Sequence, residues 1–205
     1  MSPPLNVYAL SDGAPAGVVS GALGEPVRAV RAGPFFALAG EVEQPPELTA
    51  QALRAHEAAV RRLAEACAAV LPVRFGSVVE RVDFSGREDE LLEALALVRG
   101  REQMTLRVYG NEPPLDRGSG TRYLESLRSA RALPELDPLR AALAPLIRAE
   151  RTEAKGGPVR ASVYHLIDRG SAPDYLRAMA GIPLAVRVLP SGPWPAWSFA
   201  PEALR

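Results

Sequence analysis

Few side chains in this sequence are of the types that carry out catalysis or bind metals. The 205-residue chain has one cysteine, Cys67, and two histidines, His56 and His165. A zinc site of the Cys/His type needs about four such ligands, more than these residues supply. His56-Glu57 begins like the zinc-binding helix of a metalloprotease, but Val60 stands where the second histidine belongs. We therefore expect no metal and no cofactor, and we interpret both histidines as buried structural residues.

Motifs for phosphate binding and nucleophilic catalysis are also incomplete. Gly118-Ser119-Gly120 follows a predicted strand, as a phosphate-binding loop would, but Tyr123 stands at the third glycine position. No Gly-x-Ser-x-Gly elbow of a hydrolase occurs in the sequence. Cys67 lies on the apolar side of a predicted helix, where a thiol is a small core residue and not a nucleophile. The sequence thus predicts that the protein is not an enzyme.

A C-terminal aromatic segment offers a different chemistry, that of binding. Both tryptophans lie in segment 192–199 (GPWPAWSF), where Trp194, Trp197 and Phe199 are interleaved with proline. Proline fixes φ and removes a backbone donor, so the segment is neither an ordinary helix nor a central strand. A stiff backbone with large rings near a chain end either caps a core or binds a partner. Upstream, Arg74 is the one charge in an apolar stretch, and it either pairs with a buried acid or marks a binding surface.

The composition is typical of a folded protein without a membrane span. Hydrophobic residues make up 47% of the chain and charged residues 23%, and the 24 basic and 24 acidic residues cancel. This balance argues against a general nucleic-acid binder. No apolar run reaches the roughly 18 residues of a span, and the N-terminus lacks a signal-peptide pattern. A single cysteine excludes an intrachain disulfide, so we expect a cytoplasmic protein.

The elements that must hold these residues form two α+β halves. In the first half, predicted strands at 5–10, 27–30 and 35–39, the last two joined by a hairpin at Gly33-Pro34, precede helices at 47–70 and 87–99. In the second half, strands at 103–109, 159–167 and 184–189 alternate with helices at 121–132, 138–150 and 173–180. This order predicts a ferredoxin-like layout, although one of its four strands is not visible. We expect domains at 1–100 and 101–190, followed by a Trp/Pro tail at 191–205.

Three blocks of the chain resemble the gas vesicle GvpF/GvpL family. Segment 71–79 (LPVRFGSVV) resembles the family's LP-x-RFG-T/S block, and segment 120–124 (GTRYL) resembles its G-x-x-YL helix start. Segment 192–199 resembles its terminal GPWPPYSF, with Ala196 in place of the second proline and Trp197 in place of tyrosine. The blocks keep the family's order over nearly the whole chain. We therefore identify the chain as a member of this family, of either the F type or the L type.

The resemblance implies an accessory protein of gas vesicle assembly, cytoplasmic and associated with gas vesicles. It implies two small α+β domains, the C-terminal one ferredoxin-like, and no known catalysis. The expected partners are the hydrophobic shell protein GvpA and other accessory Gvp proteins, with no nucleic acid and no membrane, and the free protein is expected to be a monomer. The alternative is a ligand-binding regulatory protein built on the ferredoxin-like domain. Seven residues are interpreted as either a protein-interaction surface or an interdomain latch: Arg74, Phe75, Gly76, Trp194, Pro195, Trp197 and Phe199.

Overall fold

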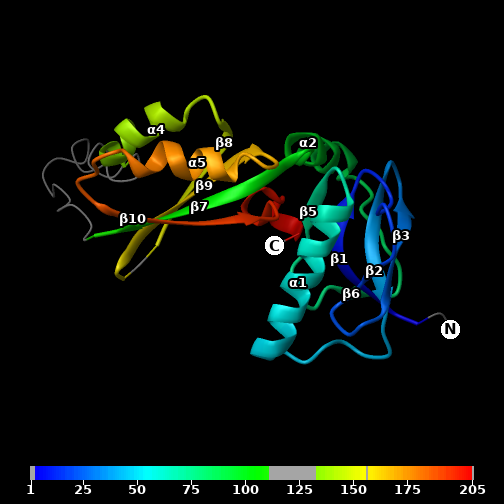
Figure 1. Ribbon diagram of the computed structural model, residues 1–205. Helices are drawn as coiled ribbons and strands as arrows, with labels where there is room; N and C mark the ends of the chain where they lie inside the picture. Colours follow the sequence, from blue (N-terminus) through cyan, green and yellow to red (C-terminus); the bar gives the residue numbers. More distant parts are fainter. Residues whose placement is uncertain (1–2, 111–132, 156, 205) are drawn as a thin grey trace, which may run out of the picture. The chain divides into compact units, whose positions relative to one another are not determined.

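The computed structural model describes residues 3–110, 133–155 and 157–204, and it combines helices with antiparallel sheets (Figure 1). The chain forms two compact units. The first unit comprises Met1–Glu102 together with Trp194–Arg205, and the second comprises Gln103–Pro193. Each unit contains its own sheet, so the α+β class predicted from the sequence is confirmed. Because the C-terminal residues belong to the first unit, both ends of the chain build the same unit.

The first unit contains a six-stranded sheet in which β1 is central. Its strands are β1 (Leu5–Ser11), β2 (Val19–Ser20), β3 (Pro26–Ala32), β4 (Phe35–Glu41), β5 (Val70–Pro72) and β6 (Val78–Val79). The order is β2-β3-β4-β1-β5, and β6 also pairs with β1. The predicted hairpin joins β3 to β4, and Gly33 in its turn has a φ of 65°, which glycine adopts without steric cost.

Helix α1 (Ala50–Ala66) is shorter at both ends than the predicted helix at 47–70. Thr49 caps its start, because its side-chain oxygen accepts a hydrogen bond from the backbone N–H of Ala52 at 3.1 Å. At the other end Cys67 has an extended backbone, with φ −124° and ψ 153°, as the chain turns into β5. The prediction of helix over the last residues was therefore wrong, because pairing of β5 with β1 requires an extended chain there.

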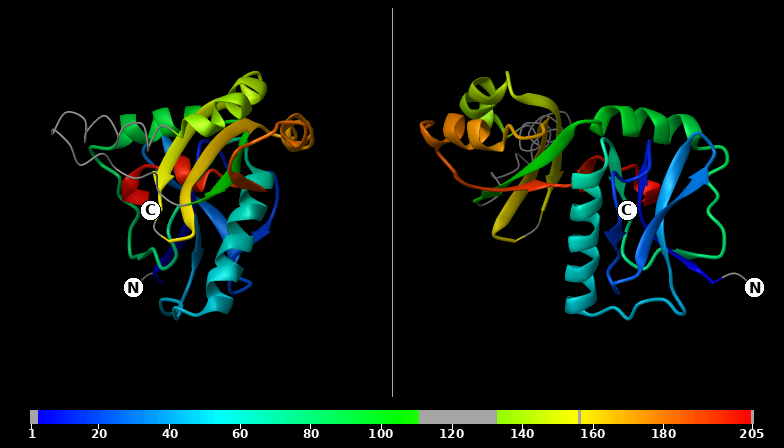
Figure 2. Two further views of the ribbon diagram at one scale, coloured as in Figure 1. Left: turned by 90° about the vertical axis from the view of Figure 1, so that its left-hand side faces the viewer. Right: turned by 45° about the vertical axis from the view of Figure 1, so that its right-hand side comes forward.

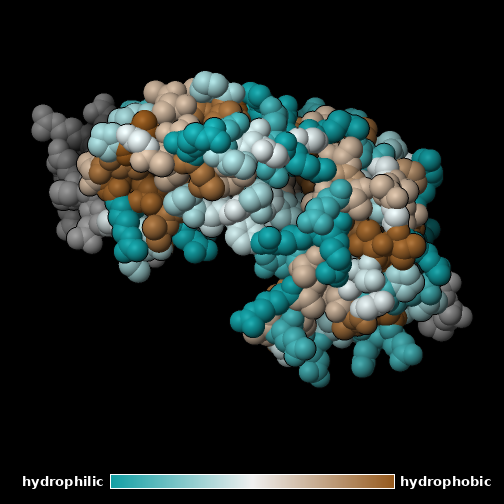
Figure 3. All heavy atoms as spheres, in the orientation of Figure 1, coloured by the Kyte–Doolittle hydropathy of each residue, from teal (hydrophilic) through white to brown (hydrophobic). Residues whose placement is uncertain are grey.

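The apolar side of α1 packs on the sheet of the first unit (Figure 2). His56 is buried, as the sequence predicted, and so are Val60 and Leu63, whereas Leu53, near the start of the helix, is 44% exposed. Hydrophilic side chains line the exposed side of α1 (Figure 3). A second helix, α2 (Glu88–Val98), also turns one apolar side inward. The core cluster under α1 consists of Tyr8, Ala9, Val19, Val27, Leu38, Ala59, Val60, Leu63, Cys67 and Val70.

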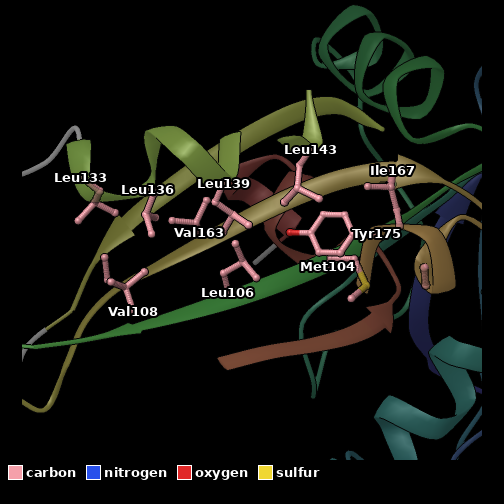
Figure 4. Close-up of a cluster of buried hydrophobic side chains, with 12 residues drawn as sticks. Met104, Leu106, Val108, Leu133, Leu136, Leu139, Leu143, Val163, Ile167 and Tyr175 are labelled. Carbon is pink, nitrogen blue, oxygen red and sulfur yellow. The ribbon is translucent and has the colours of Figure 1, made fainter. Parts of the chain in front are cut away.

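The second unit contains a four-stranded sheet in the order β10-β7-β9-β8. Its elements are β7 (Arg101–Tyr109), a 3-10 turn η1 (Pro134–Leu136), α4 (Asp137–Leu143), β8 (Ile147–Ala154), β9 (Val159–Asp168), α5 (Ala172–Ala180) and β10 (Arg187–Trp194). Figure 4 shows the leucines of η1 and α4 facing apolar side chains of β7 and β9, with Tyr175 of α5 beside them. This layer between helices and sheet is the core of the second unit.

The predicted helix at 138–150 was wrong beyond Leu143, because Ile147–Ala154 form β8. Antiparallel pairing with β9 and burial of the neighbouring apolar side chains override the helical propensity of alanine, arginine and glutamate here. β8 is the strand that the sequence prediction lacked. The elements β7-α4-β8-β9-α5-β10 follow one another in the order that a ferredoxin-like layout requires. The description of the second unit as ferredoxin-like stays a prediction. The predicted helix at 121–132 and segment 120–124 lie outside the described residues.

Strand β10 lies at the edge of its sheet, and the first residues of the Trp/Pro segment 192–199 form its end. The strand was predicted at 184–189, but it begins at Arg187 and continues to Trp194. An edge strand tolerates Pro190 and Pro193, because an edge residue need not donate to a neighbouring strand. The segment is thus no central strand, as its prolines indicated. None of the helices in the described ranges is long and apolar enough to cross a membrane.

Candidate interaction site

The block Arg74-Phe75-Gly76 forms a tight turn between β5 and β6, which both pair with β1. The hydroxyl group of Ser77 donates a hydrogen bond to the carbonyl oxygen of Arg74 at 3.0 Å and closes the turn. Gly76 has a φ of 79°, a conformation that strongly favours glycine. The turn leaves the side chain of Arg74 exposed and that of Phe75 half-buried.

The C-terminal residues fold onto the first unit through two 3-10 turns, η2 (Trp197–Phe199) and η3 (Glu202–Leu204). The buried residues of this segment are Pro195, Ala196, Phe199, Ala200, Pro201 and Leu204. The backbone N–H of Arg74 donates a hydrogen bond to the carbonyl oxygen of Leu204 at 2.8 Å. The end of the chain is therefore fixed directly to the Arg74–Gly76 turn.

His56 on α1 lies at the centre of a group of rings that joins the two sequence blocks. The centroid of its ring is 5.2 Å from that of Tyr8, 5.6 Å from that of Phe75 and 6.1 Å from that of Trp197. Phe75 meets His56 edge to face at 79°, an arrangement that aromatic rings favour. We call these four residues the ring cluster. Trp197 is half-buried and also packs against the core under α1.

One hydrogen bond orients the ring of His56. Its Nε2 atom lies 3.0 Å from the carbonyl oxygen of Val73, and because a carbonyl only accepts, Nε2–H is the donor. Its Nδ1 atom is buried without a hydrogen-bond partner in the described part of the chain. Burial lowers the pKa of His56, and the hydrogen bond to Val73 only partly opposes this effect. His56 is therefore a neutral ring that other rings pack against.

Trp194 packs on α1 and not in the ring cluster. The guanidinium carbon of Arg61 lies 4.0 Å from the centroid of the Trp194 ring, the geometry of a cation–π contact. Arg61 also forms an ion pair with Glu57 at 3.2 Å, one helical turn away. The indole ring is half-buried, so it combines a fixed position with an exposed part of its surface.

The sequence left two alternatives for Arg74, an ion pair with a buried acid or a place on a binding surface, and the structure argues against the first. Its side chain is exposed, and its guanidinium group forms no ion pair with the carboxylates of residues 3–110, 133–155 and 157–204. The buried acid that we considered as its partner is thus not found among those residues. The second alternative, a binding surface, stays a proposal.

All seven predicted site residues lie in the first unit. Sequence reasoning missed the parts of α1 and β1 that organise them, namely His56, Arg61 and Tyr8. Two signals pointed to α1: His56 occupies its apolar side, and Arg61 follows Glu57 by one turn. No local pattern, however, links this helix to a tail far along the chain.

A polar cluster in the second unit contains the other histidine. His165 Nε2 lies 2.9 Å from a carboxylate oxygen of Glu150, and its Nδ1 lies 2.6 Å from the hydroxyl oxygen of Tyr175. The hydrogen bond from His165 outweighs burial and, with help from Arg140, lowers the pKa of Glu150 to about 2. A carboxylate only accepts, so Nε2–H donates to Glu150, and the hydroxyl group of Tyr175 is the hydrogen-bond partner of Nδ1. His165 is 1% exposed, so its ring is a buried structural group held by Glu150 and Tyr175.

Metal ligands do not gather in the described part of the chain. Within residues 3–110, 133–155 and 157–204, no three side chains of His, Cys, Asp or Glu are arranged to hold an ion. Cys67 is buried in the core and forms no disulfide. The chemistry that the first unit offers is instead that of partly exposed aromatic rings beside arginines.

Comparisons with known proteins agree with the blocks found in the sequence. A family profile described as gas vesicle synthesis protein GvpL/GvpF matches residues 5–201. A search of curated proteins returned no significant match. The fold is similar to that of gas vesicle protein GvpF from Microcystis aeruginosa, with a TM-score of 0.73 and 16% identity, covering 97% of this chain and 99% of that chain. It is also similar to GvpF from Anabaena sp. PCC7120, with a TM-score of 0.75 and 16% identity, covering 98% and 97% of the two chains.

Proposed function

The chain belongs to the GvpL/GvpF family of gas vesicle synthesis proteins, and from this premise we propose that it binds the hydrophobic shell protein GvpA and other accessory Gvp proteins during assembly. A role in gas vesicle formation follows from membership of the family. The binding step, and a cytoplasmic location in association with gas vesicles, are our proposals. We assign the binding to the aromatic surface, defined as Phe75, Trp194 and Trp197 with the neighbouring Arg61 and Arg74.

The need for such a surface follows from the physics of a gas-filled shell. A shell subunit must repel water on its gas side, so it exposes a large apolar area before it is built in. Exposed apolar area of this kind drives aggregation unless a partner covers it. A partner with aromatic rings and arginines suits this task, because tryptophan and arginine are the commonest anchors of protein interfaces.

One observation carries the proposal: two distant sequence blocks bring half-buried rings together around His56. Phe75 comes from the turn after β5 and Trp197 from the C-terminal tail, and both contact the same histidine ring. Rings held in this way lose little freedom when a partner binds, which favours affinity. The exposed side chain of Arg74 beside Phe75 supplies a charge that orients the partner.

The predicted site residues divide into anchors and contacts in this proposal. Pro195 and Phe199 are buried in the first unit and fix the tail. Gly76 shapes its turn. The half-buried rings and Arg74 remain for contact with a partner. A latch between domains is the competing role for the same residues, and the binding experiment distinguishes the two roles.

The proposal is tested by pull-down of GvpA with variants of the aromatic surface. Trp194→Ala and Arg74→Ala remove contact groups without opening the core. Leu48→Ala and Arg54→Ala are matched controls, because they remove an exposed apolar side chain and an exposed arginine elsewhere in the first unit. We expect the first pair to weaken GvpA capture and the controls to leave it unchanged. Full capture of GvpA by folded Trp194→Ala and Arg74→Ala variants would show that this surface does not bind GvpA.

The role in vesicle formation has a separate test. Deletion of the gene should abolish or reduce gas vesicles in electron micrographs, and the wild-type gene should restore them. Restoration by the control variants, but not by Trp194→Ala with Arg74→Ala, would connect the aromatic surface to assembly. A deletion strain with normal vesicles would contradict a required role for this protein.

A further inference from the structure

The second unit carries an excess of positive charge. Segment 103–193 contains 13 lysine and arginine residues and 9 aspartate and glutamate residues, a net charge of +4, and the rest of the neutral chain carries the compensating −4. The balance that argued against a general nucleic-acid binder therefore describes the whole chain and not this unit. Basic residues gathered on one part of a protein attract polyanions, so their position on the unit decides what they can bind.

Ion pairs within the second unit already occupy its carboxylates. Each carboxylate in the described ranges 103–110, 133–155 and 157–193 has an arginine or lysine partner. The pairs are Arg140 with Asp137 and Glu150, Arg148 with Asp168, Lys155 with Glu153, Arg160 with Glu135, and Arg177 with Asp174. Arg107 and Arg187 form no ion pair with the described residues, and both side chains are exposed. These two arginines are therefore open to a negatively charged ligand.

Both arginines lie on the side of the sheet opposite α4 and α5. Leu106 and Val108 of β7 point into the core beneath these helices (Figure 4), so Arg107 and Tyr109 face the other side. The guanidinium carbon of Arg187 on β10 lies 5.2 Å from the centroid of the Tyr109 ring, so Arg187 shares this side. The result is a tyrosine ring with an arginine from each of two neighbouring strands beside it.

A second tyrosine lies on the next strand of the same side. Strand β9 is adjacent to β7, and Val163 of β9 belongs to the core, so Tyr164 faces away from the helices as Tyr109 does. The hydroxyl group of Tyr164 donates to Glu153 at 2.8 Å, which fixes the direction of the ring. Both tyrosine side chains are half-buried. We call the following four residues the tyrosine face: Arg107, Tyr109, Tyr164 and Arg187.

We propose that the tyrosine face binds single-stranded nucleic acid, with bases stacked on the two tyrosines and phosphates at the two arginines. The bases of a single strand are unpaired, and each presents a flat π-face that stacks on an aromatic ring. Aromatic rings on the central strands of a four-stranded sheet form such a platform, and β7 and β9 are the central strands here. An acidic peptide would pair with the arginines but offers no flat ring to both tyrosines, so the observations favour a nucleic acid. This activity is separate from the binding of GvpA that we propose for the first unit.

Fluorescence anisotropy of the full chain with a labelled single-stranded RNA of about ten nucleotides tests the proposal. We expect saturable binding by the wild type, with a slope of log affinity against log salt of about −1.4, because each of two neutralised phosphates contributes about −0.7. Tyr109→Ala should weaken binding about tenfold, and Tyr109→Phe, which keeps the ring, should bind like the wild type. Arg107→Ala together with Arg187→Ala should remove most of the salt dependence.

Matched controls come from the opposite side of the same sheet. Leu176→Ala and Arg177→Ala remove exposed side chains of α5 and should leave RNA binding unchanged. Absence of saturable binding, equal affinity of Tyr109→Ala and the wild type, or equal affinity for a duplex of the same sequence would overturn the proposal. Displacement of the RNA by an equal concentration of an acidic peptide or of a mononucleotide would also overturn it, because the ligand would then be a protein segment or a free nucleotide.

Discussion

Replacement of Trp197 by alanine tests whether the tail is part of the first unit. A fully buried tryptophan costs about 3–5 kcal/mol when truncated to alanine. The ring of Trp197 is half-buried and packs on His56 and on the core under α1, so we expect a smaller loss of about 2–3 kcal/mol of unfolding free energy. Trp197→Phe keeps a ring against His56 and should lose clearly less.

Trp194→Ala is the internal comparison for this experiment. Its main described contact is the cation–π contact with Arg61 at the helix surface, worth about 0.5–1 kcal/mol. The two tryptophans of the chain therefore differ in their expected effects on stability, although they are three residues apart in the sequence. The difference arises because one ring packs on the core cluster and the other lies over an arginine.

Tryptophan fluorescence during urea unfolding measures both effects. Both tryptophans belong to the first unit, so the signal reports the unfolding of that unit alone. Each single variant retains the other tryptophan as a probe. The reasoning predicts a lower midpoint for Trp197→Ala than for Trp194→Ala. Equal midpoints for Trp197→Ala and the wild type would show that the tail contributes nothing to the first unit, and the account of the ring cluster would be refuted.

Three further predictions follow from single contacts. His56 has a lowered pKa, so the unfolded chain binds more protons and stability falls as pH drops from 7 through 6.5 toward the native pKa; His56→Phe should flatten urea midpoints measured over this range. Gly40→Ala places Cβ 2.5 Å from Cγ of Glu25, and this clash should lower the unfolding free energy of the first unit by about 1–3 kcal/mol in the same fluorescence assay. Tyr175→Phe leaves Nδ1 of His165 buried without its hydrogen-bond partner, which should cost about 1–3 kcal/mol in calorimetry and leave GvpA capture unchanged.

Elements with strong local signals were predicted well from the sequence. The hairpin at Gly33-Pro34 was found because glycine and proline mark the turn between two apolar strands. Helix α1 was found because its apolar residues recur with helical spacing. In both cases the residues that determine the element lie next to each other in the sequence.

β8 was missed because its local sequence favours a different structure. Residues 147–154 (IRAERTEA) consist mostly of good helix formers, and charged residues occupy both faces of an exposed edge strand. Only pairing with β9 makes them a strand, and a pairing partner is not a local signal. The extension of β10 through two prolines was missed for a related reason, since only its place at the sheet edge makes proline acceptable.

The sequence predicted which residues belong to the candidate site, but not how their side chains contact one another. The blocks around Phe75 and Trp197 were recognised separately, and the contact of each with His56 depends on tertiary packing. The one-turn spacing of Glu57 and Arg61 indicates only an ion pair along the helix, although Arg61 also covers the ring of Trp194. The sequence identifies residues with binding chemistry, and the packing of α1 against the tail decides which of them are anchors.

Hydrogen–deuterium exchange of the wild-type protein with and without GvpA tests the central claim most directly. The account predicts slower exchange on GvpA binding in the Arg74–Ser77 turn and in the tail from Trp197 to Ala200, together with the adjoining part of α1. It predicts no such change for the Trp194→Ala, Arg74→Ala double variant at the same concentrations. Protection elsewhere in the chain, with unchanged exchange in these two segments, would contradict the claim that the aromatic surface meets the shell protein.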